Sequence, residues 1–260
     1  MNISLNDWLG LVILNHKGGE MMNWLMTQTW NDLLFIHWPV PAHELRPLVP
    51  RQLKLDLHDG TTWVSAVAFH LTNNRLRGLP PIPGITAFPS LNLRTYVSAG
   101  DKRGVYFFSI DADHRGVVWG GRLIFKLPYY RANIQLLQSQ ESMYNFKCTR
   151  QDVLGGQSAF QATYRPLSGD FPAAADPMTD FLTERYYLFT VDPKDQLLRV
   201  EIEHKPWVLR ETALDITENT AADAAQINLP RANPLAYYAT SMKVYLSGMI
   251  RIESDLSESY

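Results

Sequence analysis

The chain has 260 residues, and its composition of 46% hydrophobic and 19% charged residues provides ample material for a globular core. Its 24 basic and 26 acidic residues give a formal net charge of −2 without a basic run, which argues against nucleic acid or an anionic membrane as a partner. The single cysteine, Cys148, excludes an internal disulfide and a cysteine-based zinc site.

The N-terminal region carries no sign of a membrane or export segment. No apolar run approaches the roughly 20 residues of a membrane span, and the early LGLVIL run lacks the positive flank and small-residue cleavage site of a signal peptide. We therefore expect a cytoplasmic protein without a membrane partner. Residues 1–22 are predicted to be a poorly attached extension with a short helix over 5–15, and residues 23–260 to form a single domain.

The first elements of the domain are read from prolines and turn residues. A buried strand is predicted over 31–38, and the proline at the start of the next segment favours a short helix over 42–48. Residues 53–57 and 61–69 predict a hairpin, because the Asp-Gly pair between them is a strong two-residue turn signal.

The central segments are rich in aromatic and β-branched residues, which favour strands. Residues 91–97 and 104–111 predict a second hairpin. The segment 119–127 is predicted to be a strand, and Pro128 is predicted to open a helix over 129–138.

The rest of the chain continues mostly in hairpins. The expected elements are a hairpin of 141–150 with 158–164, a helix from Asp176-Pro177 to about 182, a hairpin of 184–190 with 197–204, a loop over 219–234 and a last strand over 241–252. This succession predicts a mainly β protein of the α+β class: a single, largely antiparallel, highly twisted and β-barrel-like sheet with a few short helices.

Strand alternation divides the central segments into two faces. Asn92, Arg94 and Tyr96 share one side of their strand, and Tyr106 lies on one side of the next strand with Phe108. A polar and aromatic face backed by an apolar one is what a lined pocket requires, but any half-buried sheet also has this pattern. The alternation alone leaves both interpretations open.

A second group of polar residues lies in FLTERYYLF and EHKPW. Alternation places His204 on the apolar face of its strand, where a histidine is either a hydrogen-bonded core residue or a general acid–base group. Glu184 is expected to orient His204 or to pair with Arg185, and Trp207 to form a wall or lid. The other six histidines show no metal-ligand spacing, so we expect no metal and no cofactor.

Seven ordered segments between Trp30 and Ile252 resemble a known family: HWPVP, LRPLVP, LNLRTYV, GVYFFSID, LPYYRA, FLTERY and EHKPW. Together they resemble the YqjF-like domain of unknown function, a branch of the acetoacetate-decarboxylase-like superfamily. The resemblance implies that the adjacent lysine pair of the decarboxylase corresponds to Tyr129 and Tyr130, and its pocket glutamate to Ser90. Because tyrosine cannot form a Schiff base, the decarboxylase mechanism is not expected here.

The resemblance also assigns Arg122 to the arginine of the family's Gly-Arg motif, where a guanidinium suits a ligand carboxylate. A structural salt bridge is the alternative role for Arg122, and the same two roles are open for Arg94. We therefore expect a protein that binds a small organic acid or hydrophobic metabolite without Schiff-base chemistry. The expected ligand-binding residues are Arg122, Arg94, Ser90, Tyr96, Tyr106, Tyr129, Tyr130 and Trp207.

Two other functions stay open at this stage. One is a lyase or hydrolase that uses Lys126 or His204, with Glu184 as a further catalytic candidate. The other is a non-catalytic interaction scaffold whose interior is filled by side chains. A homo-oligomer is compatible with all three functions.

Overall fold

A computed structural model describes residues 23–80, 86–139, 142–167 and 169–252 of the chain. The predicted helix over 5–15 and the N-terminal extension lie outside these residues. Within them, no helix is long and apolar enough to cross a membrane.

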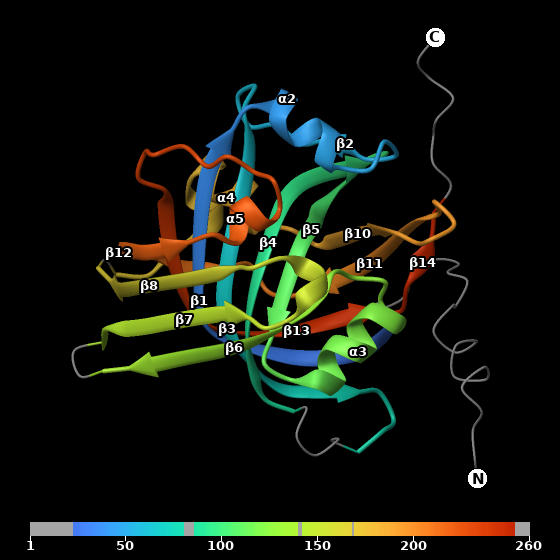
Figure 1. Ribbon diagram of the computed structural model, residues 1–260, viewed down its shortest axis with the longest axis horizontal. Helices are drawn as coiled ribbons and strands as arrows, with labels where there is room; N and C mark the ends of the chain where they lie inside the picture. The colour runs from blue at the N-terminus through green and yellow to red at the C-terminus, as the bar shows by residue number, and fades with distance from the viewer. Residues whose placement is uncertain (1–22, 81–85, 140–141, 168, 253–260) are drawn as a thin grey trace.

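The described residues form one twisted, mostly antiparallel sheet with a few short helices, as the sequence predicts (Figure 1). Its strands are β1 (Trp24–Val40), β2 (Lys54–Leu55), β3 (Thr62–Leu76), β4 (Phe88–Ala99), β5 (Lys102–Ala112), β6 (Tyr129–Gln138), β7 (Tyr144–Arg150), β8 (Ala159–Pro166), β9 (Phe171–Pro172), β10 (Tyr187–Val191), β11 (Leu197–Glu203), β12 (Val208–Asn219), β13 (Leu235–Ser247) and β14 (Ile250–Arg251). The helices are α2 (Ala42–Leu45), α3 (Arg115–Leu123), α4 (Pro177–Thr183) and α5 (Ala221–Ala224), with 3₁₀ turns η1 (Arg46–Leu48), η3 (Val153–Gly155) and η4 (Ala173–Ala175).

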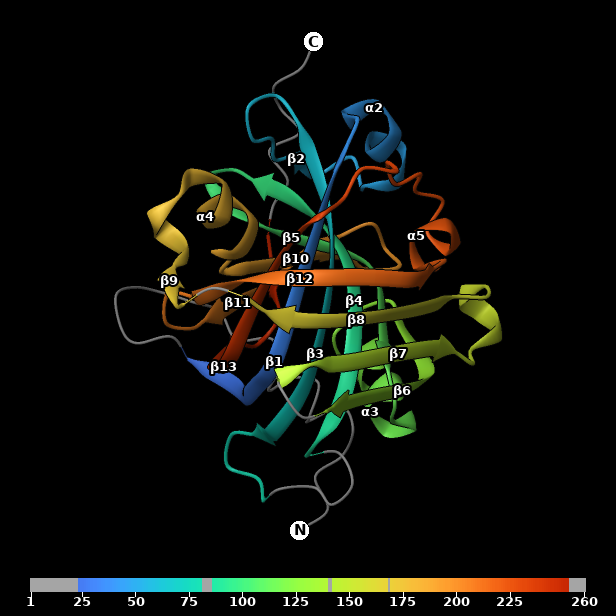
Figure 2. The same cartoon turned by 90° about the vertical axis from the view of Figure 1, so that its left-hand side faces the viewer.

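The strand pairing closes into two rings that share β13, β1, β3, β4 and β5. The first ring runs from β5 through β6, β7, β8 and β12 to β13. The second runs from β5 through β10 and β11 to β13. Figure 1 shows the two arms, with β6, β7 and β8 on one side of β4 and β5, and β10 and β11 on the other. Figure 2 shows β12, β8, β7 and β6 side by side.

Alternation along the shared strands sends neighbouring residues into different rings. Leu91 and Leu93 of β4 pack in the core cluster of the first ring, with Phe146 and Phe160 from β7 and β8. Ser90, Asn92 and Arg94 face the second ring, where they line a cavity. The two faces predicted for residues 91–97 are therefore confirmed, and the first ring is filled by large apolar side chains.

The Asp-Gly turn is also confirmed, but the expected hairpin around it is wrong. Asp59 and Gly60 both have positive φ, 48° and 76°, between the bridged residues His58 and Thr61. The strand before the turn, β2, pairs with β4 rather than with β3. A turn signal identifies the reversal of the chain but not the partner of each strand.

Two neighbouring segments have the opposite structure to the prediction. Residues 115–123, expected in part as a strand, form helix α3, whose first turn is capped by the His114 side chain through the amides of Gly116 and Val117. Residues 129–138, expected as a helix after Pro128, form β6, where Ala132 and Ile134 are buried and their neighbours on the C-terminal side are exposed. Tertiary packing therefore overrides the local signals of glycine and proline.

The C-terminal half follows the prediction in outline. Helix α4 begins after Asp176, whose carboxylate accepts hydrogen bonds from Met178 N and Thr179 N. The strand β12 was missing from the prediction, and β13 begins at Leu235, six residues before the predicted last strand. Strand β12 is half exposed, and its less exposed side begins with the polar residues Arg210 and Thr212, which weakens the apolar alternation that indicates a strand.

Candidate functional site

The second ring encloses a cavity of about 110 Å³. Its walls come from β1, β3, β4, β5, β10, β11 and β13, and segments near the ends of α3, α4 and β11 close it. The apolar lining residues are Met26, Trp30, Phe35, Val67, Phe69, Leu71, Val105, Phe107, Ile110, Phe125, Leu127, Leu188, Val200, Ile202, Trp207 and Leu246. An apolar cavity with a few polar groups is the usual form of a small-molecule site.

Arg94 carries a buried positive charge into this cavity. Its side chain comes from the middle of β4, and the residue is only 7% exposed. No carboxylate in the described part of the chain pairs with its guanidinium, and its Nε has no hydrogen-bond partner there. Burial lowers the pKa of Arg94 from its usual value, although the Tyr96 hydroxyl beside it favours the charged form. The guanidinium centre lies 5.9 Å from the ring of Phe35.

Arg185 lies immediately after α4 and lines the same cavity. Its Nη1 pairs with Asp56 Oδ2 at 2.5 Å and its Nε donates to Phe181 O at 2.7 Å, whereas its buried Nη2 lacks a partner in the described chain. Asp56 is shared, because Arg103 Nε also contacts it at 2.8 Å. One carboxylate therefore serves two arginines, and Arg94 adds a third positive charge.

A third polar atom at the cavity wall is also without a partner. The buried Oδ1 of Asn92 accepts no hydrogen bond from the described residues. Buried polar groups in proteins are nearly always hydrogen-bonded, and an exception needs an explanation. The three residues that carry such atoms, Asn92, Arg94 and Arg185, all line one cavity, which suggests a polar occupant.

A chain of hydrogen bonds holds Tyr96 beside Arg94. Tyr96 Oη donates to Leu182 O at 2.9 Å and lies 2.5 Å from Ser65 Oγ, which lies 2.5 Å from His37 Nδ1. Because the Tyr96 hydroxyl donates its proton to Leu182 O, its oxygen can accept a hydrogen bond from the Ser65 hydroxyl. Ser65 Oγ can in turn accept one from His37 Nδ1–H. Burial, together with the nearby Arg94, holds the pKa of His37 well below its usual value, so the imidazole is neutral.

His204 and Trp207 line one edge of the cavity, and Glu184 contacts Trp207 but does not bind His204. Glu184 Oε1 accepts from Trp207 N at 2.7 Å, and its other oxygen accepts from the Tyr186 hydroxyl. His204 lies between aromatic rings, 4.6 Å from Tyr186 and 5.1 Å from Trp207. Its Nδ1–H donates to Lys205 O at 2.7 Å, so in the neutral form Nε2 carries a lone pair.

The predicted site residues fall into two groups. Ser90, Arg94, Tyr129, His204 and Trp207 line the cavity, and Tyr96 packs directly behind it. Ser90 Oγ is already engaged, because it donates to Asp111 O at 2.9 Å. Burial raises the pKa of Tyr129 to about 12, so its phenol is neutral at physiological pH.

Arg122, Lys126, Tyr106 and Tyr130 do not line the cavity. Arg122, at the end of α3, pairs with Asp152 at 2.5 Å and donates to Tyr129 O at 2.6 Å. Lys126 Nζ donates to Leu123 O at 2.6 Å. The strand predicted over 119–127 would have placed Arg122 and Lys126 on one face, but Arg122 belongs to helix α3 and Lys126 follows its end.

Two rings that were expected in the pocket pack elsewhere. Tyr106 makes an edge contact with Phe108, at 5.7 Å between ring centroids. Tyr130 lies against the guanidinium groups of Arg122 and Arg150, at 5.4 and 4.2 Å from its ring centroid.

Sequence reasoning missed Arg185 and Asn92 as cavity residues. An ion pair of Arg185 with the adjacent Glu184 was one of the two expected roles of Glu184, but the carboxylate partner of Arg185 is Asp56, 129 positions away. Asn92 lies on the predicted face with Arg94, so strand alternation contained the signal. No group of three or more His, Cys, Asp or Glu side chains suited to a metal ion occurs in the part of the chain that the structure describes.

The double-ring sheet with its enclosed cavity is an acetoacetate decarboxylase-like fold. The chain resembles an acetoacetate decarboxylase-like enzyme from Sphingomonas wittichii RW1 with a TM-score of 0.60 and 17% identity, covering 89% of this chain and 94% of that one. It resembles an acetoacetate decarboxylase with a TM-score of 0.62 and 13% identity, covering 90% and 92%. It also resembles the enduracididine biosynthesis enzyme MppR in complex with pyruvate, with a TM-score of 0.64 and 12% identity, covering 90% of this chain and 93% of that one.

Within this fold, the chain belongs to the family DUF2071, described as an uncharacterized conserved protein, whose model matches residues 27–243. It is 46% identical over 221 residues to the uncharacterized protein YqjF of Bacillus subtilis (strain 168), a match that covers 85% of this chain and 90% of that protein. The family and the fold expected from the sequence are thereby confirmed.

Proposed function

We propose that this protein binds a small organic acid in the cavity of the second ring, with the acid's carboxylate at Arg94. The observation that carries the proposal is the buried guanidinium of Arg94, which has no carboxylate partner in the described chain. An uncompensated buried charge is costly, and a ligand carboxylate would supply both the countercharge and charge-assisted hydrogen bonds. Asn92 and the free Nη2 of Arg185 are further polar contacts for the same ligand.

Imine chemistry is not part of this proposal. No lysine is among the described residues that line the cavity, and Tyr129 occupies a position where the resemblance places a lysine. Lys126 donates its ammonium protons to the end of α3. MppR, which shares the fold, is solved with pyruvate, a small keto acid. That likeness favours pyruvate as a first probe.

The test compares two arginines that differ in position. Titration calorimetry with pyruvate and butyrate measures binding to the wild type, to Arg94→Met and to Arg165→Met. Loss of a charge-assisted hydrogen bond at Arg94 weakens binding by about 1.5–3 kcal/mol. Arg165→Met is the matched control, because Arg165 is exposed on β8 of the first ring and does not line the cavity. Equal binding by both variants, or equal binding of the neutral butyramide, would rule the proposal out.

A second candidate function is general-base catalysis by His204 on a bound acid. It is favoured by the position of His204 at the cavity wall with Nδ1 engaged and Nε2 free to accept a proton. Exchange of the α-protons of pyruvate in deuterated buffer, followed by NMR, tests it. The exchange rate should fall in His204→Gln while pyruvate affinity stays; unchanged exchange would exclude this role. The alternative of a non-catalytic scaffold requires an interior filled by side chains. The first ring has such an interior, but the second ring contains the cavity.

A further inference from the structure

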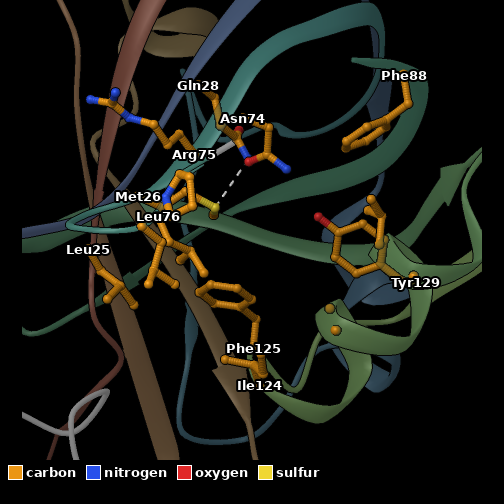
Figure 3. A pocket seen from close by; sticks show the side chains of 16 residues that line it. Leu25, Met26, Gln28, Asn74, Arg75, Leu76, Phe88, Ile124, Phe125 and Tyr129 are labelled. Carbon is orange, nitrogen blue, oxygen red and sulfur yellow. Dashed lines mark hydrogen bonds between the residues drawn. The ribbon is translucent and has the colours of Figure 1, made fainter. Parts of the chain in front are cut away.

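A second cavity, of about 120 Å³, lies beneath helix α3 (Figure 3). We call it the outer cavity and the one containing Arg94 the inner cavity. Its walls include Leu25 and Leu76 from β1 and β3, and Val117 and Ile124 from α3 and the residue that follows it. Four residues, Met26, Gln28, Phe125 and Tyr129, line both cavities.

These shared residues form a neck between the two spaces. Figure 3 shows Met26, Leu76 and Phe125 close together on one side of the hollow and Tyr129 on the other, with the phenol oxygen of Tyr129 turned towards the hollow. Gln28 is held in place because its Oε1 accepts from Trp30 Nε1 at 2.8 Å and its Nε2 donates to Asn74 Oδ1 at 3.3 Å. The neck is therefore built from positioned side chains.

Packing against α3 fixes the Tyr129 side of the neck. A Cβ on Gly121 would stand 2.2 Å from a ring carbon of Tyr129, so the ring lies directly on this glycine. The backbone oxygen of Tyr129 accepts from Arg122 Nε. Arg122 thus acts as a positioning residue for the neck.

The two cavities differ in charge. The buried cations, Arg94 and Arg185, belong to the inner cavity, and the one charged wall residue of the outer cavity, Arg75, is exposed with its guanidinium directed away from the hollow (Figure 3). A ligand that matches both spaces has an anionic group at one end and an apolar chain at the other.

We propose that the two cavities bind one amphipathic monocarboxylic acid, with its carboxylate at Arg94 and its alkyl chain passing Tyr129 into the outer cavity. This inference rests on the proposed function and adds the ligand class. A ligand of two or three carbons occupies the inner cavity alone, and a chain of medium length fills both. Each methylene buried beyond the neck then contributes to affinity.

The first test is a chain-length series. Calorimetry with propionate, hexanoate and decanoate should show the dissociation constant falling by up to roughly fourfold for each added methylene, because burial of a methylene favours binding by about 0.8 kcal/mol. A dissociation constant that stays flat or rises along the series overturns the two-cavity inference.

The second test fills the outer cavity. Gly120 lines it, and a Cβ built there meets no atom within 4 Å, so Gly120→Phe places a ring in open space. Propionate affinity should stay within twofold of the wild type, while the gain for decanoate disappears. Gly120→Ala is the matched control and should retain the whole series. If Gly120→Phe does not fold, the test is repeated with Val117→Phe, which lies one turn earlier in α3 and also lines the outer cavity.

The outcomes separate the two proposals. If propionate binds in an Arg94-dependent way but decanoate gains nothing, or if both filled variants retain the full gain, only the two-cavity inference fails. If none of the acids binds, or if all bind equally well to Arg94→Met, the proposed function fails as well.

Discussion

Asp111 and Arg150 form a two-pronged ion pair inside the fold, with Arg150 Nε 2.7 Å from Asp111 Oδ1 and Nη2 2.8 Å from Oδ2. Both side chains are almost completely buried, at 1% and 2% exposure. The pair links the end of β5 to the end of β7, where β6 begins its parallel pairing with β5. It therefore holds the first ring closed beside the cavity.

Removing one charge of this pair should cost much more than removing a surface charge. Asp111→Asn keeps the shape but leaves Arg150 buried without its countercharge, and we expect a loss of about 3–5 kcal/mol in the free energy of unfolding. Arg51→Gln breaks an exposed pair with Asp195 and should change the free energy of unfolding little, because solvent screens exposed charges. Urea unfolding measures the free energy of unfolding of both variants. Similar losses would show that the buried pair contributes no more to stability than the exposed one.

His37 should make stability depend on pH below neutrality. Its folded-state pKa lies well below the unfolded value of about 6.5, so below that pH the unfolded chain binds a proton that the native protein excludes. Its contribution to stability is fully present above pH 6.5 and falls by up to about 1.4 kcal/mol per pH unit as the pH drops towards the folded-state pKa.

The measurement is urea unfolding at pH 7.5, 6.5, 5.5 and 5.0. His37→Asn preserves a donor to Ser65 and should flatten the slope relative to the wild type. His43→Asn, at an exposed position of α2, should leave the slope unchanged. A wild-type slope in His37→Asn would mean that His37 is accessible to protons in the native state.

Adjacent glycines in α3 should respond oppositely to alanine. Gly121→Ala drives a methyl group into the Tyr129 ring, and overpacking of this kind costs about 1–3 kcal/mol. Gly120→Ala meets open space and should stabilise the helix by up to about 1 kcal/mol. Thermal unfolding of the two variants provides the comparison, and Tyr129→Leu should partly rescue Gly121→Ala. Equal effects would contradict the close packing of Tyr129 on α3.

Arg94→Met should make the ligand-free protein more stable. The substitution removes a buried charge that lacks an anionic partner and keeps much of the side-chain volume, and comparable replacements are often stabilising by about 1–4 kcal/mol. A higher unfolding midpoint together with weaker butyrate binding would identify Arg94 as a residue kept for recognition. A lower midpoint would indicate that Arg94 supports the fold itself.

The sequence predicted those parts of the fold that local patterns encode. Alternation in 91–97 separates Leu93 from Arg94, and the Asp176-Pro177 pair marks the start of α4. It failed for α3 and β6, where glycines and a proline suggest the wrong element. Gly121 is a glycine because of Tyr129, and that requirement comes from packing between two elements rather than from the helix.

The site was predictable to a similar extent. Ser90, Arg94, Tyr129, His204 and Trp207 were named from the sequence and line the inner cavity. The partners of Arg122 and Arg185 were not predicted, because these partners, Asp152 and Asp56, are distant in the chain. Which of several arginines lacks a carboxylate is a property of the folded chain, so residue type and spacing do not reveal it.

The two rings of the sheet have different roles: the first holds a packed core, and the second holds the inner cavity. Aromatic and aliphatic side chains pack the first ring, so a change at the polar positions of the cavity leaves the core of the first ring in place. In a scaffold organised in this way, a lysine at the cavity can be replaced and an arginine retained without a change in the packing of the first ring. The same separation makes the hollow ring a suitable place to install new binding specificities by design.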